Sequence, residues 1–457
     1  MGRRVVISVV ALLAVAAIAA AGPAMAATVQ LSTDTAGSCL SSAPSASADG
    51  TVVVFESTCN PSGTNSDANS EIFQATVGGS LVQLTDTSSC ENSSAAISSD
   101  GSSVAFESNC DLADNNSDGS VEVFLYASAA FTQLGSGSSC DSYAPSLSSD
   151  GTAIAFESDC DFADNNSDGN SEIFLSTAAA VVSQLTNDSS GTYCDSLAAR
   201  ISADGTVVVF ESDCDLVGTN SDEIGEIFRV TSAGVVTQLT ATAEDTCSSW
   251  EPALSADGTT VVFGSDCDFT DGNSDGSDEI FRVTLDSTLT QLTDSSYTAG
   301  CGSYSPGISS DGTVVVYNSY CDPLSNNSDG SHELFKLTSE YSVQLTSGIS
   351  CSSTLPMLSS DGTEVAYQSD CDPTGGNPAA QSQVFLTSTC SCGGPVSRTG
   401  PDSTLASDAL FALKAAVGLL VCQLCECDVD DSGSILAADA LAILKNSVGL
   451  SVDGFCQ

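Results

Sequence analysis

Short apolar segments separated by polar turn residues recur along most of the chain. Between residues 144 and 186, four of them follow one another as APSLSS, TAIAFES, SEIFLS and VVSQLT. They are rich in Val, Ile and Phe and are bounded by Gly, Asn, Asp and Ser, a composition that predicts β-strands joined by turns. The second segment is apolar almost throughout, which is typical of a strand covered on both faces. The pattern predicts units of four short strands.

The four segments repeat with a period near fifty residues. An Asp-Gly pair marks the turn between the first two segments, and successive pairs are 50 to 54 residues apart, at Asp49, Asp100, Asp150, Asp204, Asp257, Asp311 and Asp361. This period indicates a repeat architecture, and four antiparallel strands per repeat are typical of a propeller blade. We expect an all-β seven-bladed β-propeller over residues 28–389, with four antiparallel strands per blade.

The two ends of the repeat region are out of phase. A Gln-Leu segment belongs to the fourth strand of each unit, and the first one, Gln30-Leu31, precedes the first Asp-Gly turn. The last unit ends at QVFLTST without such a segment. Gln30-Leu31 can therefore supply the outer strand of the last blade, which would close the ring and remove an exposed sheet edge.

Fourteen of the 20 cysteines recur at one fixed spacing within the repeats. Every interval is 20 residues with the Asp-Gly turn at its midpoint, for Cys39 and Cys59, Cys90 and Cys110, Cys140 and Cys160, Cys194 and Cys214, Cys247 and Cys267, Cys301 and Cys321, and Cys351 and Cys371. We expect each pair to link the open ends of one hairpin, which contributes about 3 kcal/mol in the chain-entropy model. Bridges between neighbouring blades are the alternative, because sequence does not fix connectivity.

The beginning of the chain predicts export, and its charge narrows the classes of partner. Residues 1–26 combine Arg3 and Arg4, an apolar run and Ala24-Met25-Ala26, which predicts a secretory signal peptide. No later stretch has the roughly 20 apolar residues of a membrane helix. The net charge is −50, which repels nucleic acid and anionic lipid, attracts cations and favours solubility in salt. We expect a monomer that is secreted, cell-surface or periplasmic.

The repeat resembles a known family. Its pattern SxDGxxxAFES, EIF and QLT is similar to that of the TolB-type, WD-repeat-like propellers, and the resemblance covers nearly all of residues 28–389. It implies the propeller fold. The family includes periplasmic scaffold proteins and the propeller portions of peptidases, so no single function follows from it.

The loop between the second and third strands resembles a calcium loop. In SDCDFADNNSDGNSEIF, residues 158–174, side-chain oxygens stand at positions 1, 3, 5 and 9. Leu175 occupies the place of the last carboxylate of an EF-hand, so the loop is closer to the shorter calcium loops of integrin alpha propellers. Three loops carry the full predicted ligand set, namely Asp114, Asn116, Asp118 and Glu122; Asp164, Asn166, Asp168 and Glu172; and Asp271, Asn273, Asp275 and Glu279.

The alternative is that these loops are only tight turns. Asx side chains cap backbone amides, and Gly supplies a positive φ. Asn at position 3 persists in all seven loops, including the seventh, which has Ala379 and Gln383 where the others have acids. This persistence favours a turn role for the Asn, whereas the joint loss of the acids favours metal for the carboxylates.

Three aromatic residues are expected on the face that carries these loops. Tyr143, Trp250 and Tyr304 each lie three residues after the first cysteine of their repeat, at the beginning of the innermost strand. There they would lie near the channel mouth and stack on a sugar or peptide, or else pack beneath the loops. We expect this acidic face to bind a protein or glycan partner.

Residues 390–457 differ in composition from the repeats. Two matching segments, 403–419 and 434–450, have apolar residues at helical spacing, including Leu413, Leu441 and Leu444, and end with Gly. Six cysteines in this region are expected to form three disulfides, namely Cys390, Cys392, Cys422, Cys425, Cys427 and Cys456.

The segment DVDDSGSILAAD has calcium-loop spacing. The predicted ligands at positions 1, 3, 5, 7 and 12 are Asp428, Asp430, Ser432, Ser434 and Asp439. Residues 397–452 resemble a type I dockerin, which implies a small α-helical calcium-binding domain and a cohesin-like partner. The loop before the first helix lacks most ligands, and Ala437-Ala438 stand at positions that carry cohesin recognition in the family.

The sequence favours binding over catalysis. Its one histidine, His332, has no nucleophile context and is expected to be a surface substitution. The glutamates at the start of the third strands recur by symmetry, which favours structure or metal, so no catalytic residue is predicted. We expect a secreted non-enzymatic scaffold or binding propeller with a docking tail. The alternatives are a dockerin-borne carbohydrate-active hydrolase or lyase, and a calcium-stiffened spacer.

Overall fold

The computed structural model describes the repeat region and a short part of the tail. The described residues are 28–32, 39–162, 164–177, 179–188, 194–242, 246–295, 301–339, 342–389, 409, 412–413, 416 and 437–447. The predicted signal peptide, the six tail cysteines and most of the tail calcium loop lie outside them, namely Asp428, Asp430, Ser432, Ser434 and the side chain of Asp439. Within the described residues, no helix is long and apolar enough to cross a membrane.

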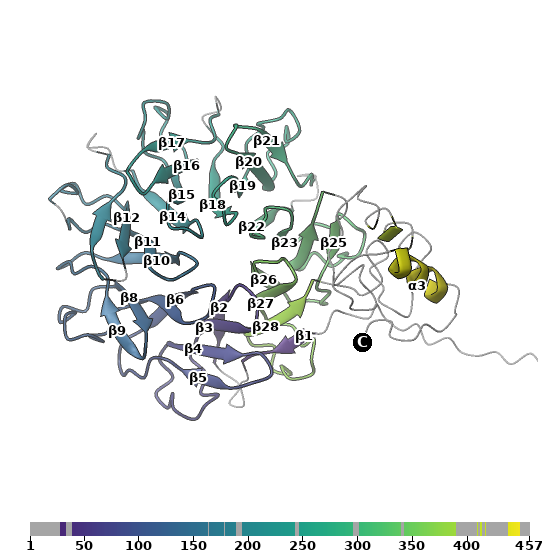
Figure 1. The fold of residues 1–457 in the computed structure, drawn as a ribbon, viewed down its shortest axis with the longest axis horizontal. Coiled ribbons are helices and arrows are strands. Elements are labelled where there is room, and N and C mark those ends of the chain that lie inside the picture. Colours follow the sequence, from purple (N-terminus) through teal and green to yellow (C-terminus); the bar gives the residue numbers. More distant parts are fainter. Residues whose placement is uncertain are drawn as a thin grey trace, which may run out of the picture.

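Seven four-stranded antiparallel sheets surround a central axis, which confirms the predicted propeller (Figure 1). The innermost strands are β2 (Ser41–Ala46), β6 (Asn92–Ile97), β10 (Ser142–Leu147), β14 (Ser196–Ile201), β18 (Ser249–Leu254), β22 (Ser303–Ile308) and β26 (Ser353–Leu358). The second strands are β3 (Val52–Ser57), β7 (Ser103–Ser108), β11 (Ala153–Ser158), β15 (Val207–Ser212), β19 (Thr260–Ser265), β23 (Val315–Ser319) and β27 (Glu364–Ser369).

The outer half of each blade follows in the same order. The third strands are β4 (Glu71–Thr76), β8 (Glu122–Ala127), β12 (Glu172–Thr177), β16 (Glu226–Thr231), β20 (Glu279–Thr284), β24 (Glu333–Leu337) and β28 (Gln383–Ser388). The fourth strands are β5 (Leu81–Gln83), β9 (Ala130–Gln133), β13 (Val182–Gln184), β17 (Val236–Gln238), β21 (Leu289–Gln291), β25 (Ser342–Gln344) and β1 (Thr28–Gln30). Blades 1 to 7 are numbered here from β2 to β26.

Two devices close the ring. β1 pairs antiparallel with β28, with Gln30 opposite Phe385, so the N-terminal segment completes blade 7 as predicted. Around the axis, the residue before each Asp-Gly pair donates its N–H to the carbonyl of its counterpart in the next blade at 2.8–3.0 Å, and the circuit returns to its start through Ala48, Ser99, Ser149, Ala203, Ala256, Ser310 and Ser360. This backbone ring lies at the Asp-Gly end of the channel.

Apolar contacts between blades form the core. An aromatic residue of each second strand stacks on a Phe of the third strand, with ring centroids 5.5–6.1 Å apart, as in Phe210 and Phe228. Ile173 and Ala155 of blade 3 pack against Phe210 of blade 4, and equivalent clusters join the other neighbours. Burial of such side chains contributes about 1.5–3 kcal/mol each, which explains the nearly continuous apolar second strands.

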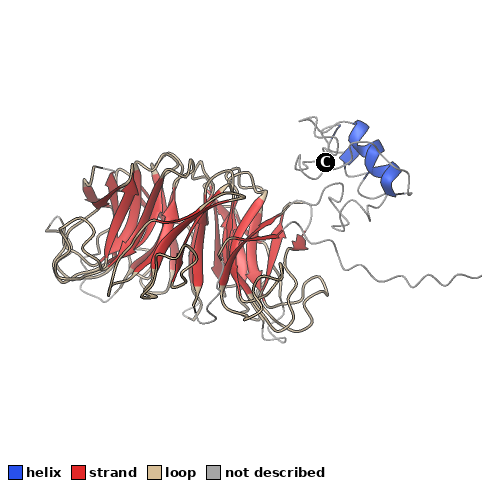
Figure 2. Ribbon diagram, turned by 90° about the horizontal axis from the view of Figure 1, so that it is seen from below, coloured by secondary structure: helices blue, strands red, loops and turns tan. Residues whose placement is uncertain are grey.

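All seven predicted hairpin disulfides are present. Each joins cysteines 20 residues apart with Cα atoms 4.9–5.4 Å apart, so the alternative of bridges between blades is wrong. The bridges lie at the ends of the hairpins opposite the Asp-Gly turns. Figure 2 shows the propeller edge-on, with connections at both faces.

The described part of the tail contains the helix α3 (Ala437–Ser447), which lies within the second predicted helix. Ala440 and Ile443 are buried, whereas Leu441 and Leu444 are 52% and 43% exposed. Among the described side chains of α3, burial therefore falls on Ala440 and Ile443. A complete dockerin-like domain stays a prediction.

Candidate functional site

The loops between second and third strands share one structural clamp. In blade 3, Nδ2 of Asn166 donates to the carbonyl oxygens of Cys160 at 3.4 Å and Asn170 at 2.9 Å. The same two side-chain contacts occur in the other six loops, at Asn65, Asn116, Asn220, Asn273, Asn327 and Asn377. All seven side chains are buried. This clamp explains why Asn persists where the acids are absent.

The first position of each loop has a left-handed backbone. The φ angle is 58° at Asp114 and Asp164, 57° at Asp271 and 58° at Ser325. Glycine occupies the position in the other loops, at Gly63, Gly218 and Gly375. Asp and Gly are residue types that tolerate this conformation. Backbone geometry therefore accounts for the residues found here, and the three Asp side chains are exposed.

The predicted ninth-position ligands begin the third strands and are buried. Glu172 accepts hydrogen bonds from Thr186 Oγ1 at 2.5 Å and from the Asp188 N–H at 2.8 Å, so it anchors the segment that leads to the next blade. Glu122 accepts the Gly137 N–H at 3.1 Å through Oε1, while its buried Oε2 has no hydrogen-bond partner among the described residues. Burial raises the pKa of both glutamates to about 7.

The structure places the acids of each predicted calcium loop in two locations. In the described part of the chain, the groups of three acidic or sulfur-bearing side chains with ligand atoms within 4.8 Å of one another each combine cysteines with one Asp. The predicted carboxylate sets are not among these groups, namely Asp114, Asp118 and Glu122; Asp164, Asp168 and Glu172; and Asp271, Asp275 and Glu279. The aspartates are exposed and the glutamates turn inward, so calcium here stays a prediction.

The three predicted aromatic residues are half-buried in the inner strands. Tyr143 lies opposite Glu157, and Trp250 lies opposite Gly264. A Cβ on Gly264 would stand 2.5 Å from Trp250 Nε1, so the indole occupies the space of a side chain there. The Tyr304 hydroxyl donates to Asp278. Trp250 also lines a groove of about 370 Å³ together with acidic side chains of blade 4, at Asp195, Glu211, Asp213 and Glu223.

Every innermost strand contains a bulge at its third residue. The strand register shifts there, and φ is 48–54° at Ala43, Ser94, Ala144, Ala198, Glu251, Ser305 and Leu355. The bulged N–H turns toward the preceding blade. In blades 2 to 5 it donates to a second-strand glutamate at 2.7–3.0 Å, namely Glu56, Glu107, Glu157 and Glu211. The repeated glutamates therefore join neighbouring blades.

Blades 5 to 7 depart from this arrangement. Gly264 replaces the glutamate in blade 5, and the Ser305 amide donates instead to Glu251 Oε2 at 3.1 Å. In blade 6 the position is Asn318, whose Nδ2 lies 3.2 Å from His332 Nδ1. In blade 7 it is Gln368, which accepts the Ala43 N–H at 3.3 Å. The repeat thus breaks on one side of the channel.

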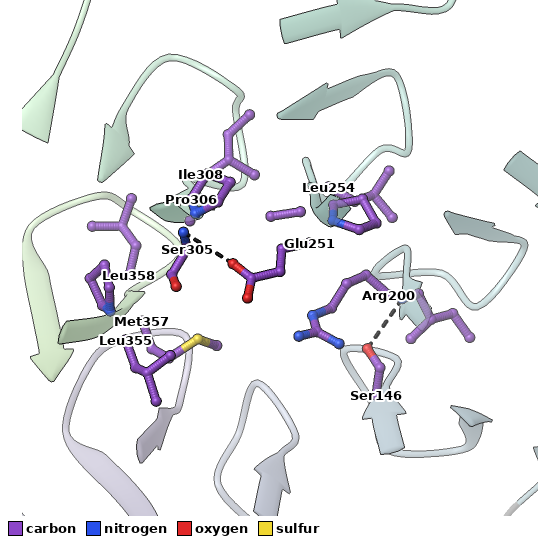
Figure 3. Close-up of a pocket in the computed structure, with 15 residues that line it drawn as sticks. Ser146, Arg200, Glu251, Leu254, Ser305, Pro306, Ile308, Leu355, Met357 and Leu358 are labelled. Carbon is purple, nitrogen blue, oxygen red and sulfur yellow. Dashed lines mark hydrogen bonds between the residues drawn. The ribbon is translucent and has the colours of Figure 1, made fainter. Parts of the chain in front are cut away.

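The same side of the channel forms a well of about 270 Å³ (Figure 3). Arg200 of β14 projects into it at a position where the other blades have Ser45, Ala96, Ser146, Ala253, Gly307 and Met357. Glu251 lies on the neighbouring β18 and is exposed to the well. The rest of the wall is largely apolar and comes from β18, β22 and β26, with Leu254, Pro306, Ile308, Leu355 and Met357.

His332 is not the surface substitution that the sequence suggests. It is half-buried beside Tyr320 and Tyr304, with ring centroids at 5.0 and 6.2 Å, and the two tyrosines stack at 5.9 Å. Burial lowers the pKa of His332, which favours the neutral imidazole near pH 7. His332 is therefore part of a packed aromatic cluster.

Arg200, Glu251 and Gly264 were missed from the sequence. The sequence does contain a sign of them, because each differs from most of the residues at the equivalent position of the other blades. The histidine and the recurring carboxylates are more conspicuous in the sequence than these three departures within the second and innermost strands.

No protein-family model and no curated protein sequence matches the chain. Solved structures do match: an oligogalacturonate lyase from Vibrio parahaemolyticus has TM-score 0.54 and 13% identity over 80% of this chain and 98% of that one. The propeller domain of the trilobed protease from Pyrococcus furiosus has TM-score 0.50 and 10% identity over 76% and 95%. TolB from Acinetobacter baumannii has TM-score 0.39 and 21% identity over 61% of each chain. At these identities, the first two likenesses show a shared propeller fold.

Proposed function

We propose that the chain is an exported, non-enzymatic binding propeller whose ligand site is the well around Arg200. The carrying observation is Arg200 itself, a cation at a ring position that is otherwise small or apolar. No carboxylate of the described residues lies within ion-pair distance, 4.0 Å, of its nitrogens. A guanidinium held this way offers its donors to a ligand. Seven disulfides support export to an oxidising compartment.

The recurring carboxylates support binding over catalysis. Glu107, Glu157 and Glu211 each accept a bulge amide at 2.7 Å, and Glu172 anchors the segment leading to the next blade. These contacts give the glutamates a structural role in every regular blade. General acid–base catalysis instead requires a group within reach of the substrate.

The test is a binding screen of the full chain against glycan and peptide arrays. We expect at least one ligand class that binds the wild type and not Arg200→Ala. Arg229→Ala is the matched control, since it removes the same charge from β16 in the same blade. Binding that Arg200→Ala leaves intact would contradict the assignment of the well, and turnover of any bound ligand would contradict the non-enzymatic role.

A carbohydrate-active lyase or hydrolase is the second candidate. The cluster of His332, Tyr304 and Tyr320 favours it, because a neutral imidazole beside tyrosines is a candidate general base at a point where the sequence departs from the repeat. The propeller of the oligogalacturonate lyase is similar in fold. Release of unsaturated or reducing sugar ends from polysaccharides, lost in His332→Ala, would establish this activity; no release by the wild type would reject it.

Of the three predicted calcium loops, the one in blade 2 is the one for which we propose calcium binding. The buried Glu122 Oε2 has no hydrogen-bond partner among the described residues, whereas both oxygens of Glu172 are engaged. A cation would satisfy such an oxygen. Calorimetric titration of calcium into chelator-treated protein is expected to lose one propeller site in Glu122→Gln. Stoichiometry unchanged by this variant would reject the site.

A calcium-dependent docking role is proposed for the tail. Its support is the spacing of Asp428, Asp430 and Asp439 in the sequence. Asp428→Ala with Asp430→Ala is expected to remove one bound calcium from the full chain and to weaken capture of a cohesin-like or surface partner. A partner that binds equally well without calcium would contradict this role.

A further inference from the structure

The well presents opposite charges from neighbouring blades. Arg200 Nη1 donates to the Ala199 carbonyl at 2.9 Å, which fixes the guanidinium while its other donors face the channel. Glu251 uses Oε2 for the Ser305 amide at 3.1 Å. Its other oxygen points toward the middle of the well (Figure 3). The two side chains form no ion pair within 4.0 Å, and both are exposed.

The opposite wall is apolar and accessible. Leu355 and Met357 of β26 are 39% and 40% exposed although they lie inside the ring, and Ile308 continues the surface on β22. Apolar side chains that face a narrow channel gain about 25 cal/mol for each Å² that a ligand covers. The wall therefore favours a ligand with a hydrocarbon part.

The net charge decides between classes of ligand. A free carboxylate would suit Arg200, because the planar guanidinium binds carboxylates through two parallel hydrogen bonds. The chain carries a net charge of −50, however, and therefore a strongly negative field. This field repels an anion and attracts a cation, but Arg200 would repel a ligand that carries only a positive charge. A molecule with both charges and no net charge avoids both penalties.

We infer that the well binds a small zwitterion with an apolar side chain, its carboxylate on Arg200, its ammonium on Glu251 and its side chain against Leu355 and Met357. The inference rests on the proposed binding function and names its ligand class. A volume of about 270 Å³ suits a molecule of amino-acid size. Free apolar amino acids and short apolar peptides share this chemistry.

Isothermal titration with matched probes tests the inference. L-leucine carries both charges, 4-methylpentanoate only the carboxylate, and 3-methylbutylamine only the ammonium, on the same isobutyl group. Leucyl-leucine separates the two charges and distinguishes a peptide from a free amino acid. We expect saturable binding of leucine or leucyl-leucine with Kd at or below about 1 mM, and at least tenfold weaker binding of the single-charge probes.

The variants separate the two contacts. Arg200→Ala is expected to weaken zwitterion binding roughly 10- to 100-fold, and Glu251→Gln to weaken it while leaving 4-methylpentanoate unaffected. Arg229→Ala should bind like the wild type, and unchanged unfolding temperatures would show that the variants fold. Equal affinity for leucine and 4-methylpentanoate, or no response to either zwitterion, would overturn the inference. The proposed function would still stand if an array ligand depended on Arg200.

Discussion

Blades 1 to 4 and blades 5 to 7 differ in the residue that faces the bulge amide of the next blade. In both regions a bulge in the innermost strand presents an amide to the preceding blade. In blades 1 to 4 the acceptor is a second-strand glutamate, namely Glu56, Glu107, Glu157 or Glu211. Gly264, Asn318 and Gln368 stand at that position in blades 5 to 7, where Gln368 still accepts the Ala43 amide. The comparison teaches that a repeated acid is structural here, and that the departures mark the side of the channel where Arg200 and Glu251 form a well.

Removing a hairpin disulfide should have the largest effect on stability, and the effect should be equal in the two regions. Replacing one hairpin disulfide by serines should cost about 3 kcal/mol of unfolding free energy. Because all seven close hairpins of the same length, Cys90→Ser with Cys110→Ser in blade 2 and Cys301→Ser with Cys321→Ser in blade 6 should match. Denaturant unfolding measures both. A loss of unfolding free energy in only one of the two variants would show that the disulfides of the two regions contribute differently.

Restoring the regular residue in blade 5 should destabilise the protein. A Cβ at Gly264 would stand 2.5 Å from Trp250 Nε1, so Gly264→Glu forces the indole to move, at a cost of about 1–3 kcal/mol. Blade 3 pairs Tyr143 with Glu157 at the same register. Adding Trp250→Tyr should therefore recover most of the loss in thermal unfolding. A fully stable Gly264→Glu single variant would refute the steric explanation.

The buried Glu157 of blade 3 should make the stability of the propeller depend on pH. Burial raises the pKa of Glu157 from its ordinary value near 4.5 to about 7, and the charges of Glu107 and Arg200 act in opposite directions on it. The folded state keeps its proton where the unfolded state has lost it, so the contribution is fully present below about pH 4.5 and declines as pH rises through 7.

Glu157→Gln should reduce that decline, because Gln368 makes the same contact in blade 7. We expect its Tm to exceed that of the wild type by about 1–3 °C at pH 8 and to match it near pH 4. Calorimetric melting across pH 4–8 measures the difference. Parallel profiles for the two proteins would mean that Glu157 is ionised throughout this range.

The smallest effect concerns the loop where Asp164 has φ of 58°. Asp164→Gly should change stability by less than about 0.5 kcal/mol without calcium, since Gly fills this position in three loops, and Asp164→Ala should cost about 1 kcal/mol. Chemical denaturation in chelator measures both. If Asp164 binds calcium, added calcium should stabilise the wild type more than either variant; equal stabilisation of all three would remove it as a ligand.

The fold was predictable because its determinants are local and repeated. The Asp-Gly period gave seven units, the 20-residue interval gave the pairing of Cys140 with Cys160, and Gln30-Leu31 gave the closure. The loop chemistry was less predictable, because a left-handed backbone at Asp164 and an inward-turned Glu172 select the same residue types as a calcium cage does.

The well could not be derived from any single segment. Arg200 lies in SLAARI, a short strand whose sequence gives no sign of a site. Only ring closure brings β14 and β18 to the same channel as β26, and only comparison across blades shows that Arg200 and Glu251 are exceptions.

The most direct measurement determines Tm and leucine affinity together for Glu107→Ala and Arg200→Ala. Glu107 accepts the Ala144 amide in the regular region, so its loss should lower stability by about 1–3 kcal/mol and leave binding unchanged. Arg200→Ala should lower Tm less than Glu107→Ala does and weaken leucine binding roughly 10- to 100-fold. The reverse result, a stable Glu107→Ala that no longer binds or an Arg200→Ala that unfolds early yet binds normally, would contradict the division between structural repeat and binding site.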